Sequence, residues 1–237
     1  QRYSNLKELP KAVITFGIST LDFELSKLYQ SPKHFDDKKI NFLYVGRAGT
    51  DMYKTNRLLF LAFKHGLKIN FDLFNQIYFH FIGTSYAPSG FGKPSVEQIA
   101  VDTGIATYVT EQTSRIPFYA AINALQQADV LMMIGSDDSQ YTASKIYPYI
   151  LAEKPMIAIF HPKSSAVDIV NQCSEGILIT LDEINNALIQ KTYIALKELA
   201  ESYNTKREIR WHNFNLYTAS TRTQLQCNLF DKVINAN

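Results

Sequence analysis

Short apolar runs alternate with stretches of helical periodicity along most of the chain. The runs are rich in β-branched and aromatic residues, and they end at glycines or polar residues. Runs that are apolar at nearly every position, and not only at every second one, are typical of strands buried on both faces of a sheet. They predict strands at residues 39–45, 77–82, 106–109, 129–134, 156–160 and 176–179.

Between these runs, apolar residues recur every three to four positions, which indicates amphipathic helices. Gly66 and Gly104 are expected to close the first two helices, and Ser164 or Ser165 is expected to cap a later one. The expected helices span residues 55–64, 95–102, 117–127, 145–153, 164–171, 181–203 and 212–234. This alternation predicts a doubly wound, Rossmann-like α/β domain, in which helices cover both faces of a parallel sheet.

Composition narrows the class of protein. Hydrophobic residues make up 46% of the 237 residues, which is enough for a substantial core. The net charge is only +2, with both signs spread along the sequence, so a nucleic-acid partner is not expected. The two cysteines, Cys173 and Cys227, stand apart, which fits a reducing compartment. No apolar run reaches the roughly 18 residues of a membrane helix, and no ligand set has metal-site spacing.

Ligands of open parallel sheets bind beyond the carboxyl ends of the strands, so the loops after each strand are the candidate site. The first such loop contains Gly46, Arg47 and Gly49. Glycines let the backbone approach a phosphate closely, and a guanidinium can donate two parallel hydrogen bonds to phosphate oxygens. The alternative is an ordinary tight turn with a surface arginine.

Polar residues also follow the next two strands. Thr84 and Ser85 have hydroxyls that could bind phosphate or sugar, although such residues cap helices equally well. Residues 110–115, with Glu111, could border a nucleobase, and a solvated loop is the alternative.

Residues 136–145 form the richest of these loops. Pro148 has no amide hydrogen, so the following helix is expected to begin near Ser144 or Lys145. A lysine in a first helical turn opposes the helix dipole unless an anion binds there. The polar residues of this loop are therefore candidate ligand contacts: Ser136, Asp137, Asp138, Tyr141, Thr142, Ser144 and Lys145.

Other chemistry is less well supported. The sequence contains no GxGxxG, GxxxxGK[ST] or GxSxG motif. His80 lies within an apolar run and is expected in the core. His161 follows the run 156–160 and faces the ligand side of the predicted sheet.

Three segments together resemble the C-terminal domain of GT-B-fold glycosyltransferases of the family-4-like, or "glycosyl transferases group 1", kind. They are YVGRAGTDM (44–52), FHFIGTSY (79–86) and the block 116–160, which ends in KPMIAIF. The resemblance covers roughly residues 39–180, and the last helix is also similar. Residues 16–26 resemble the chain that arrives from the N-terminal domain of that fold.

The resemblance implies a nucleoside-diphosphate-sugar donor and a glycan, lipid or polysaccharide acceptor. Arg47 and Lys145 would neutralise the leaving diphosphate, so no metal or other cofactor is expected. Thr142 and Ser144 would bind phosphate oxygens, and Asp137 and Asp138 would bind sugar hydroxyls. Residues 110–115 would border the base.

The resemblance also implies the organisation of the chain. Residues 1–38 would be a linker from a missing N-terminal acceptor domain, 39–204 the donor-binding domain, and 205–237 a helix that crosses back. Gln1 and the polar opening fit a cut or processed chain, or the loss of only a few residues. A bacterial cytoplasmic protein is expected, with membrane attachment through the missing half.

One departure keeps other functions open. Many relatives carry two glutamates where this chain has Gln140 and Pro148, and the second of them usually binds the donor ribose. A non-catalytic sugar-nucleotide-binding or protein-interaction domain is one alternative. A UDP-sugar 2-epimerase-like enzyme is another, although only His161 is suitably placed for its acid–base chemistry. A response regulator is disfavoured, because no acidic pocket follows the first strand.

Overall fold

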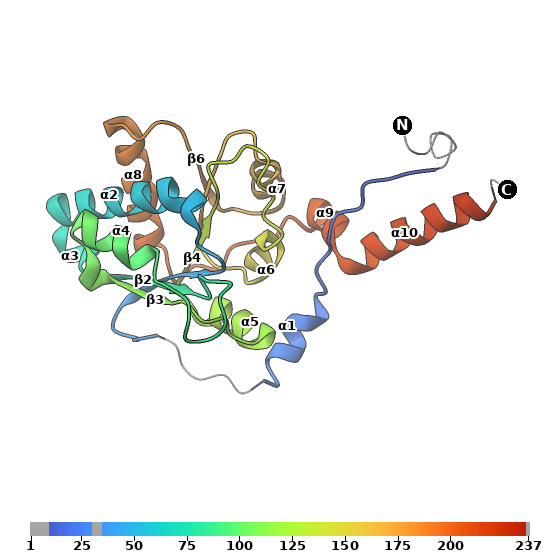
Figure 1. Cartoon of the computed structure of the whole chain (residues 1–237), viewed down its shortest axis with the longest axis horizontal. Coiled ribbons are helices and arrows are strands. Elements are labelled where there is room, and N and C mark those ends of the chain that lie inside the picture. Colours follow the sequence, from blue (N-terminus) through green and yellow to red (C-terminus); the bar gives the residue numbers. More distant parts are fainter. Residues whose placement is uncertain (1–9, 30–34, 236–237) are drawn as a thin grey trace.

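The structure, a computed structural model, describes residues 10–29 and 35–235. Its centre is an all-parallel sheet with the strand order β3-β2-β1-β4-β5-β6 (Figure 1). The order reverses between β1 and β4, which is the topological switch point of a doubly wound fold. The strands are β1 (Ile40–Val45), β2 (Ile77–Ile82), β3 (Val109–Gln112), β4 (Val130–Ile134), β5 (Met156–Phe160) and β6 (Ile177–Thr180).

Helices cover both faces of the sheet, as the sequence predicts. On one face α2 (Tyr53–Ile69) packs against α4 (Val96–Thr103) and α8 (Asn186–Glu201) (Figure 1). The other face carries α5 (Phe118–Gln127), α6 (Ile146–Leu151) and α7 (Ser165–Cys173). Shorter helices are α1 (Leu21–Ser26), which packs on α5, and α3 (Phe71–Phe74), which follows α2.

Aromatic packing fixes α2 on β2. Phe63 lies edge-on to Phe79, with ring centroids 4.9 Å apart, and Phe60 meets Phe81 at 6.0 Å. All four rings are fully buried, and burial of one such side chain is worth about 1.5–3 kcal/mol. This packing holds β2 in place, and the candidate site begins at the carboxyl ends of β2 and its neighbour β1.

Three predicted boundaries are wrong. The strand expected at 106–109 is a short 3-10 helix, Ala106–Tyr108, and the strand begins only at Val109. Only the ring of Tyr108 packs inward there, against Phe63 at 5.1 Å, while Ala106 and Thr107 are exposed. Gly66 does not end α2, which continues to Ile69, and the ring of Phe74 occupies the space that a side chain at position 66 would need. The helix expected at 181–203 begins only at Asn186.

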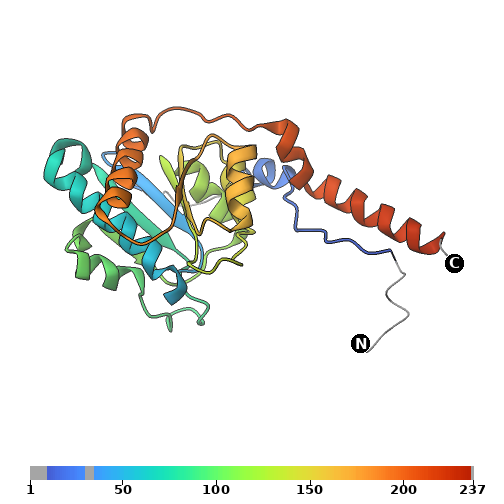
Figure 2. The same cartoon turned by 90° about the horizontal axis from the view of Figure 1, so that it is seen from above.

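The final helix is also different from the prediction. Residues 212–234 divide into α9 (Trp211–Phe214), a 3-10 turn (Asn215–Tyr217) and α10 (Ala219–Ile234). The break lies at Thr218, whose hydroxyl accepts a hydrogen bond from the amide of Thr221. Every residue of α10 is at least partly exposed, and the helix projects away from the sheet (Figure 2).

Segments near the two ends of the described chain lie side by side at Ile18 and Thr218. The Ile18 amide donates to the Tyr217 carbonyl, and the Ala219 amide donates to the Ile18 carbonyl, at 3.0 and 2.8 Å. The entering segment and α10 therefore leave the sheet on the same side (Figures 1 and 2). The domain limits drawn from the sequence remain predictions.

Candidate functional site

A cleft of about 370 Å³ opens at the carboxyl edge of the sheet, between the ends of β1 and β2 and the helices α5 and α6. It lies at the switch point, where ligands of doubly wound sheets bind. Cationic side chains from three separate loops reach it, and apolar side chains of α5 form its other wall. The lining residues include Val45, Gly46, Arg47, Ile82, Gly83, Tyr86, Arg115, Ile116, Phe118, Ile122, Lys145, Pro148 and Tyr149.

Lys145 enters this cleft directly over the turn after β1. A Cβ atom built on Gly46 would overlap the Lys145 ammonium nitrogen, so only glycine admits the lysine here. The same nitrogen lies 6.0 Å from the centre of the Tyr44 ring. The two loops that the sequence singled out therefore meet in one cleft.

The Lys145 ammonium is half-buried and has no counter-ion within residues 10–29 and 35–235. Burial, together with the nearby positive charges of Arg115 and Arg47, lowers its pKa to about 8. An anion that binds beside this ammonium group stabilises its charged form.

Arg47 is held in a fixed orientation by Asp51. Two parallel hydrogen bonds of 2.7 Å join its guanidinium to the carboxylate. These bonds raise the pKa of Arg47 and lower the pKa of Asp51. Gly49 makes the pair possible, because a side chain there would overlap the guanidinium.

The structure also brings Arg115 to the cleft. The sequence placed this residue in a loop, 110–115, that could border a nucleobase or be solvated. Its guanidinium lies 4.2 Å from the centre of the Tyr86 ring, and both side chains line the cleft. The available signal was its position: like Arg47, it is an arginine in a loop that directly follows a strand.

Thr84 and Glu111 lie beside the cleft and are engaged with each other. The Thr84 hydroxyl donates to the Glu111 carboxylate at 2.5 Å. The carboxylate also accepts the amides of Ser95, Val96 and Glu97 at the start of α4. Glu111 therefore caps α4 and does not line the cleft.

Hydroxyls in the β2 and β4 loops likewise bond locally. Ser85 accepts the amide of Ala87, and Ser136 is buried and accepts the amide of Asp138. The Asp138 carboxylate accepts the amide of Gln140, and Asp137 is exposed on the same turn. None of these described residues lines the cleft.

The residues between that turn and Lys145 point elsewhere. α6 begins at Ile146, close to the predicted start, but Thr142 and Ser144 line a second, larger cleft beside α10. Tyr141 is half-buried, and its carbonyl accepts the hydroxyl of Ser164. The loop thus brings only Lys145 to the first cleft.

His80 and His161 make hydrogen bonds within the fold. His80 is half-buried and so does not lie in the core, where it was predicted; it contacts the Thr110 hydroxyl at 2.9 Å and the Asn41 side chain at 3.1 Å. His161 accepts the amide of Lys163 in the loop after β5.

Two features are absent from residues 10–29 and 35–235. No group of three or more His, Cys, Asp or Glu side chains is arranged to hold a metal. No helix combines the length and apolar character needed to cross a membrane.

Comparison with known proteins supports the fold. The sequence matches no family model and no curated protein. A glycosyltransferase from Rickettsia africae matches 95% of this chain with a TM-score of 0.62 and 12% identity, over 58% of its own length. HepE from Anabaena, in complex with UDP, matches 93% with a TM-score of 0.62 and 14% identity, over 57% of its length.

A UDP-forming α,α-trehalose-phosphate synthase from Burkholderia xenovorans, in complex with glucose-6-phosphate, matches 92% of the chain. Its TM-score is 0.57 at 13% identity, over 51% of its length. The chain thus spans about half the length of these structures. These proteins are GT-B glycosyltransferases, and the predicted fold, a Rossmann-like half of GT-B, is confirmed.

Proposed function

We propose that this chain is the donor-binding half of a glycosyltransferase and holds the diphosphate of a nucleoside-diphosphate sugar in the first cleft. Arg47, Lys145 and Arg115 are the groups that bind it. The missing half contributes to acceptor binding, and the reaction takes place in the cytoplasm, with membrane attachment through that half. Solved structures of the same fold that carry UDP support this choice of ligand.

The observation that carries the proposal is the uncompensated charge around Lys145. Three cations line the cleft, and only Arg47 has a carboxylate partner among the described residues. Partly desolvating a cation without a partner is unfavourable, and an anion restores the lost interaction. Two linked phosphates can contact guanidinium and ammonium groups from separate loops at once.

The same charges would assist the transfer step. When the bond between the sugar and the diphosphate breaks, negative charge accumulates on the leaving diphosphate. Fixed cations at that place stabilise the transition state more than the ground state. They take the role that a divalent cation has in other transferases, so we expect no metal requirement.

The nucleobase and the sugar of the donor are assigned to two further places. Ile116, Phe118 and Ile122 form an apolar wall on which a nucleobase can lie. We assign the sugar hydroxyls to the exposed turn of Asp137 and Asp138, which lies after β4 at the same edge of the sheet.

Calorimetric titration with UDP- and GDP-sugars tests the proposal. Lys145→Ala and Arg115→Ala should each weaken binding by about 1–3 kcal/mol, the range for hydrogen bonds to charged groups. Lys163→Ala is the matched control, because this exposed lysine also follows a strand but does not line the cleft. Equal affinity of all four proteins would refute the phosphate site.

A non-catalytic sugar-nucleotide-binding domain is the second candidate. Gln140 and Pro148 stand where related enzymes carry glutamates, so a ribose contact of that kind is absent from these positions. Turnover of a nucleotide sugar by the full-length protein supports the enzyme, and binding without turnover supports the sensor. The epimerase-like reading is weaker, because His161 does not line the cleft.

A further inference from the structure

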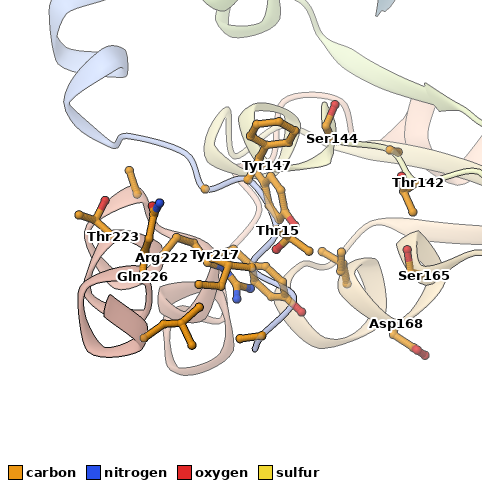
Figure 3. Close-up of a pocket in the computed structure, with 18 of the residues that line it drawn as sticks. Thr15, Thr142, Ser144, Tyr147, Ser165, Asp168, Tyr217, Arg222, Thr223 and Gln226 are labelled. Atoms are coloured by element: carbon orange, nitrogen blue, oxygen red, sulfur yellow. The ribbon is translucent and has the colours of Figure 1, made fainter. Parts of the chain in front are cut away.

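A second cleft of about 1080 Å³ lies between the two ends of the described chain and the helices α6 and α7. The segment around Thr15 and the helix α10 form one side, and the residues before α6 and the first turns of α7 form the other (Figure 3). Clefts for small ligands usually measure about 300–1,000 Å³, so this one, here named the terminal groove, suits a ligand of several linked units.

The walls of the terminal groove combine apolar side chains, such as Ile14, Leu229 and Phe230, with hydroxyl and amide groups. The polar groups come from both walls: Thr142 and Ser144 from the loop before α6, Gln172 from α7, and Thr223 and Gln226 from α10. Such groups both donate and accept hydrogen bonds, as sugar hydroxyls do.

Charge in the terminal groove is balanced. Asp168 on α7 offers only acceptors, and Arg222 on α10 offers only donors (Figure 3). One carboxylate and one guanidinium together favour neither a polyanion nor a polycation. A neutral ligand with many hydroxyls can satisfy both.

Arg222 is held in place with a donor unmet. Its guanidinium lies 4.9 Å from the centre of the Tyr217 ring, and Tyr217 stacks on Tyr147 at 5.1 Å. Its buried Nε atom has no hydrogen-bond partner in the described part of the chain. The stacked rings fix the side chain beside the groove, and its unmet donor is a second sign that this place is adapted to a ligand.

The terminal groove adjoins the proposed diphosphate cleft through two consecutive residues. Ser144 lines the groove, whereas Lys145 lines the diphosphate cleft. We propose that the terminal groove binds a neutral oligosaccharide, the acceptor, and presents one end of it towards the donor at this segment. The acceptor role rests on the proposed function, whereas oligosaccharide binding does not.

Methyl NMR of the whole chain tests the proposal with three probes: maltotetraose, cellotetraose and chitotetraose. At least one probe should shift the methyl signals of Ile14, Ile169 and Leu229, which line the groove, and leave Ile122 of the other cleft unchanged. Failure of all three probes at millimolar concentration to shift the groove signals would overturn the proposal. So would shifts confined to the diphosphate cleft.

Variants of groove residues make the test specific. Gln226→Ala and the near-isosteric Asp168→Asn should each weaken binding about three- to tenfold, the loss of one hydrogen bond. Gln224→Ala is the matched control, because Gln224 lies on α10 outside the groove and bonds Asn228. Equal effects of Gln224→Ala and Gln226→Ala would contradict the assignment, and unaltered thermal melting excludes misfolding.

The outcomes separate this inference from the proposed function. Oligosaccharide binding in the groove together with failure to bind UDP leaves the glycan site standing and removes its acceptor role. UDP binding without groove signals overturns the inference alone. If UDP and a tetrasaccharide both bind, a larger shift of the Ala143 methyl signal in the ternary complex supports their meeting at this segment, and independent binding contradicts it.

Discussion

The ammonium group of Lys145 occupies the space in which a side chain on Gly46 would stand. Lys145 is the residue before α6, and Gly46 follows β1, so the contact joins two loops that are a hundred residues apart in sequence. Lys145 can take this position in the cleft because residue 46 has no side chain.

Gly46→Ala should therefore weaken nucleotide binding while the protein still folds. The flexible end of Lys145 can move away from a new methyl group, and this displacement should cost about 1–3 kcal/mol of UDP affinity. Calorimetry measures the effect. In the double variant with Lys145→Ala, the alanine at position 46 should add little, since the two changes act through one interaction. Simple additivity would contradict the coupling.

Lys145 should also govern stability at alkaline pH. Its pKa of about 8 in the folded chain lies below the ordinary value of 10.5, so the folded state binds fewer protons between these values. The free energy of unfolding should consequently rise with pH in this window, by about 1–3 kcal/mol. Urea unfolding at pH 7.5 and 10 should show this gain in the wild type and a smaller one in Lys145→Met. Identical gains would contradict the uncompensated burial of this lysine.

Asp51 should act in the opposite pH range. Its pKa is lowered by the hydrogen bonds from Arg47, so its contribution is present at neutral pH and is lost as pH falls through the lowered value. Both side chains are about one-third exposed, which limits the contribution to about 1 kcal/mol or less. Urea unfolding at pH 7 and pH 3 should show a smaller acid loss in Asp51→Asn than in the wild type; a loss of equal size would argue against the pair.

Glu111 should matter for stability more than for ligand binding. Glu111→Ala leaves three amides of α4 and the Thr84 hydroxyl without their acceptor, and should cost about 1–3 kcal/mol. Thermal and urea unfolding measure this loss. Glu97→Ala, which removes a neighbouring exposed carboxylate, is a suitable comparison. A large drop in UDP affinity with unchanged stability would contradict this and indicate that Glu111 contributes to ligand binding.

Much of the fold could be predicted because the strands are buried on both faces. The limits of β2 and β5 match the prediction, since each is a compact apolar run that ends at a polar residue or glycine. The prediction of a strand at 106–109 was wrong because the short 3-10 turn of Ala106–Tyr108 contains residue types that a strand start also contains. The prediction that Gly66 ends α2 was wrong because glycine also occurs inside a helix where a neighbouring ring, here that of Phe74, leaves no room for a side chain.

The candidate site was predictable only in part. Strand order places the loops of Arg47 and Lys145 at one edge, so their meeting could be expected. The direction in which Thr142 and Ser144 point depends on the backbone path of an irregular loop, which periodicity does not describe. Arg115 was predicted only as part of a loop that could border a nucleobase, because the sequence does not show that its guanidinium turns towards the loops of Arg47 and Lys145.

The side-chain NMR signal of Lys145, assigned with the Lys145→Arg variant, tests the diphosphate site most directly. Titrated alone, the chain should show Lys145 losing its proton near pH 8. With saturating UDP the midpoint should rise clearly, because the diphosphate stabilises the ammonium form, whereas uridine should leave it unchanged. A Lys145 titration that is the same with and without UDP would contradict the account.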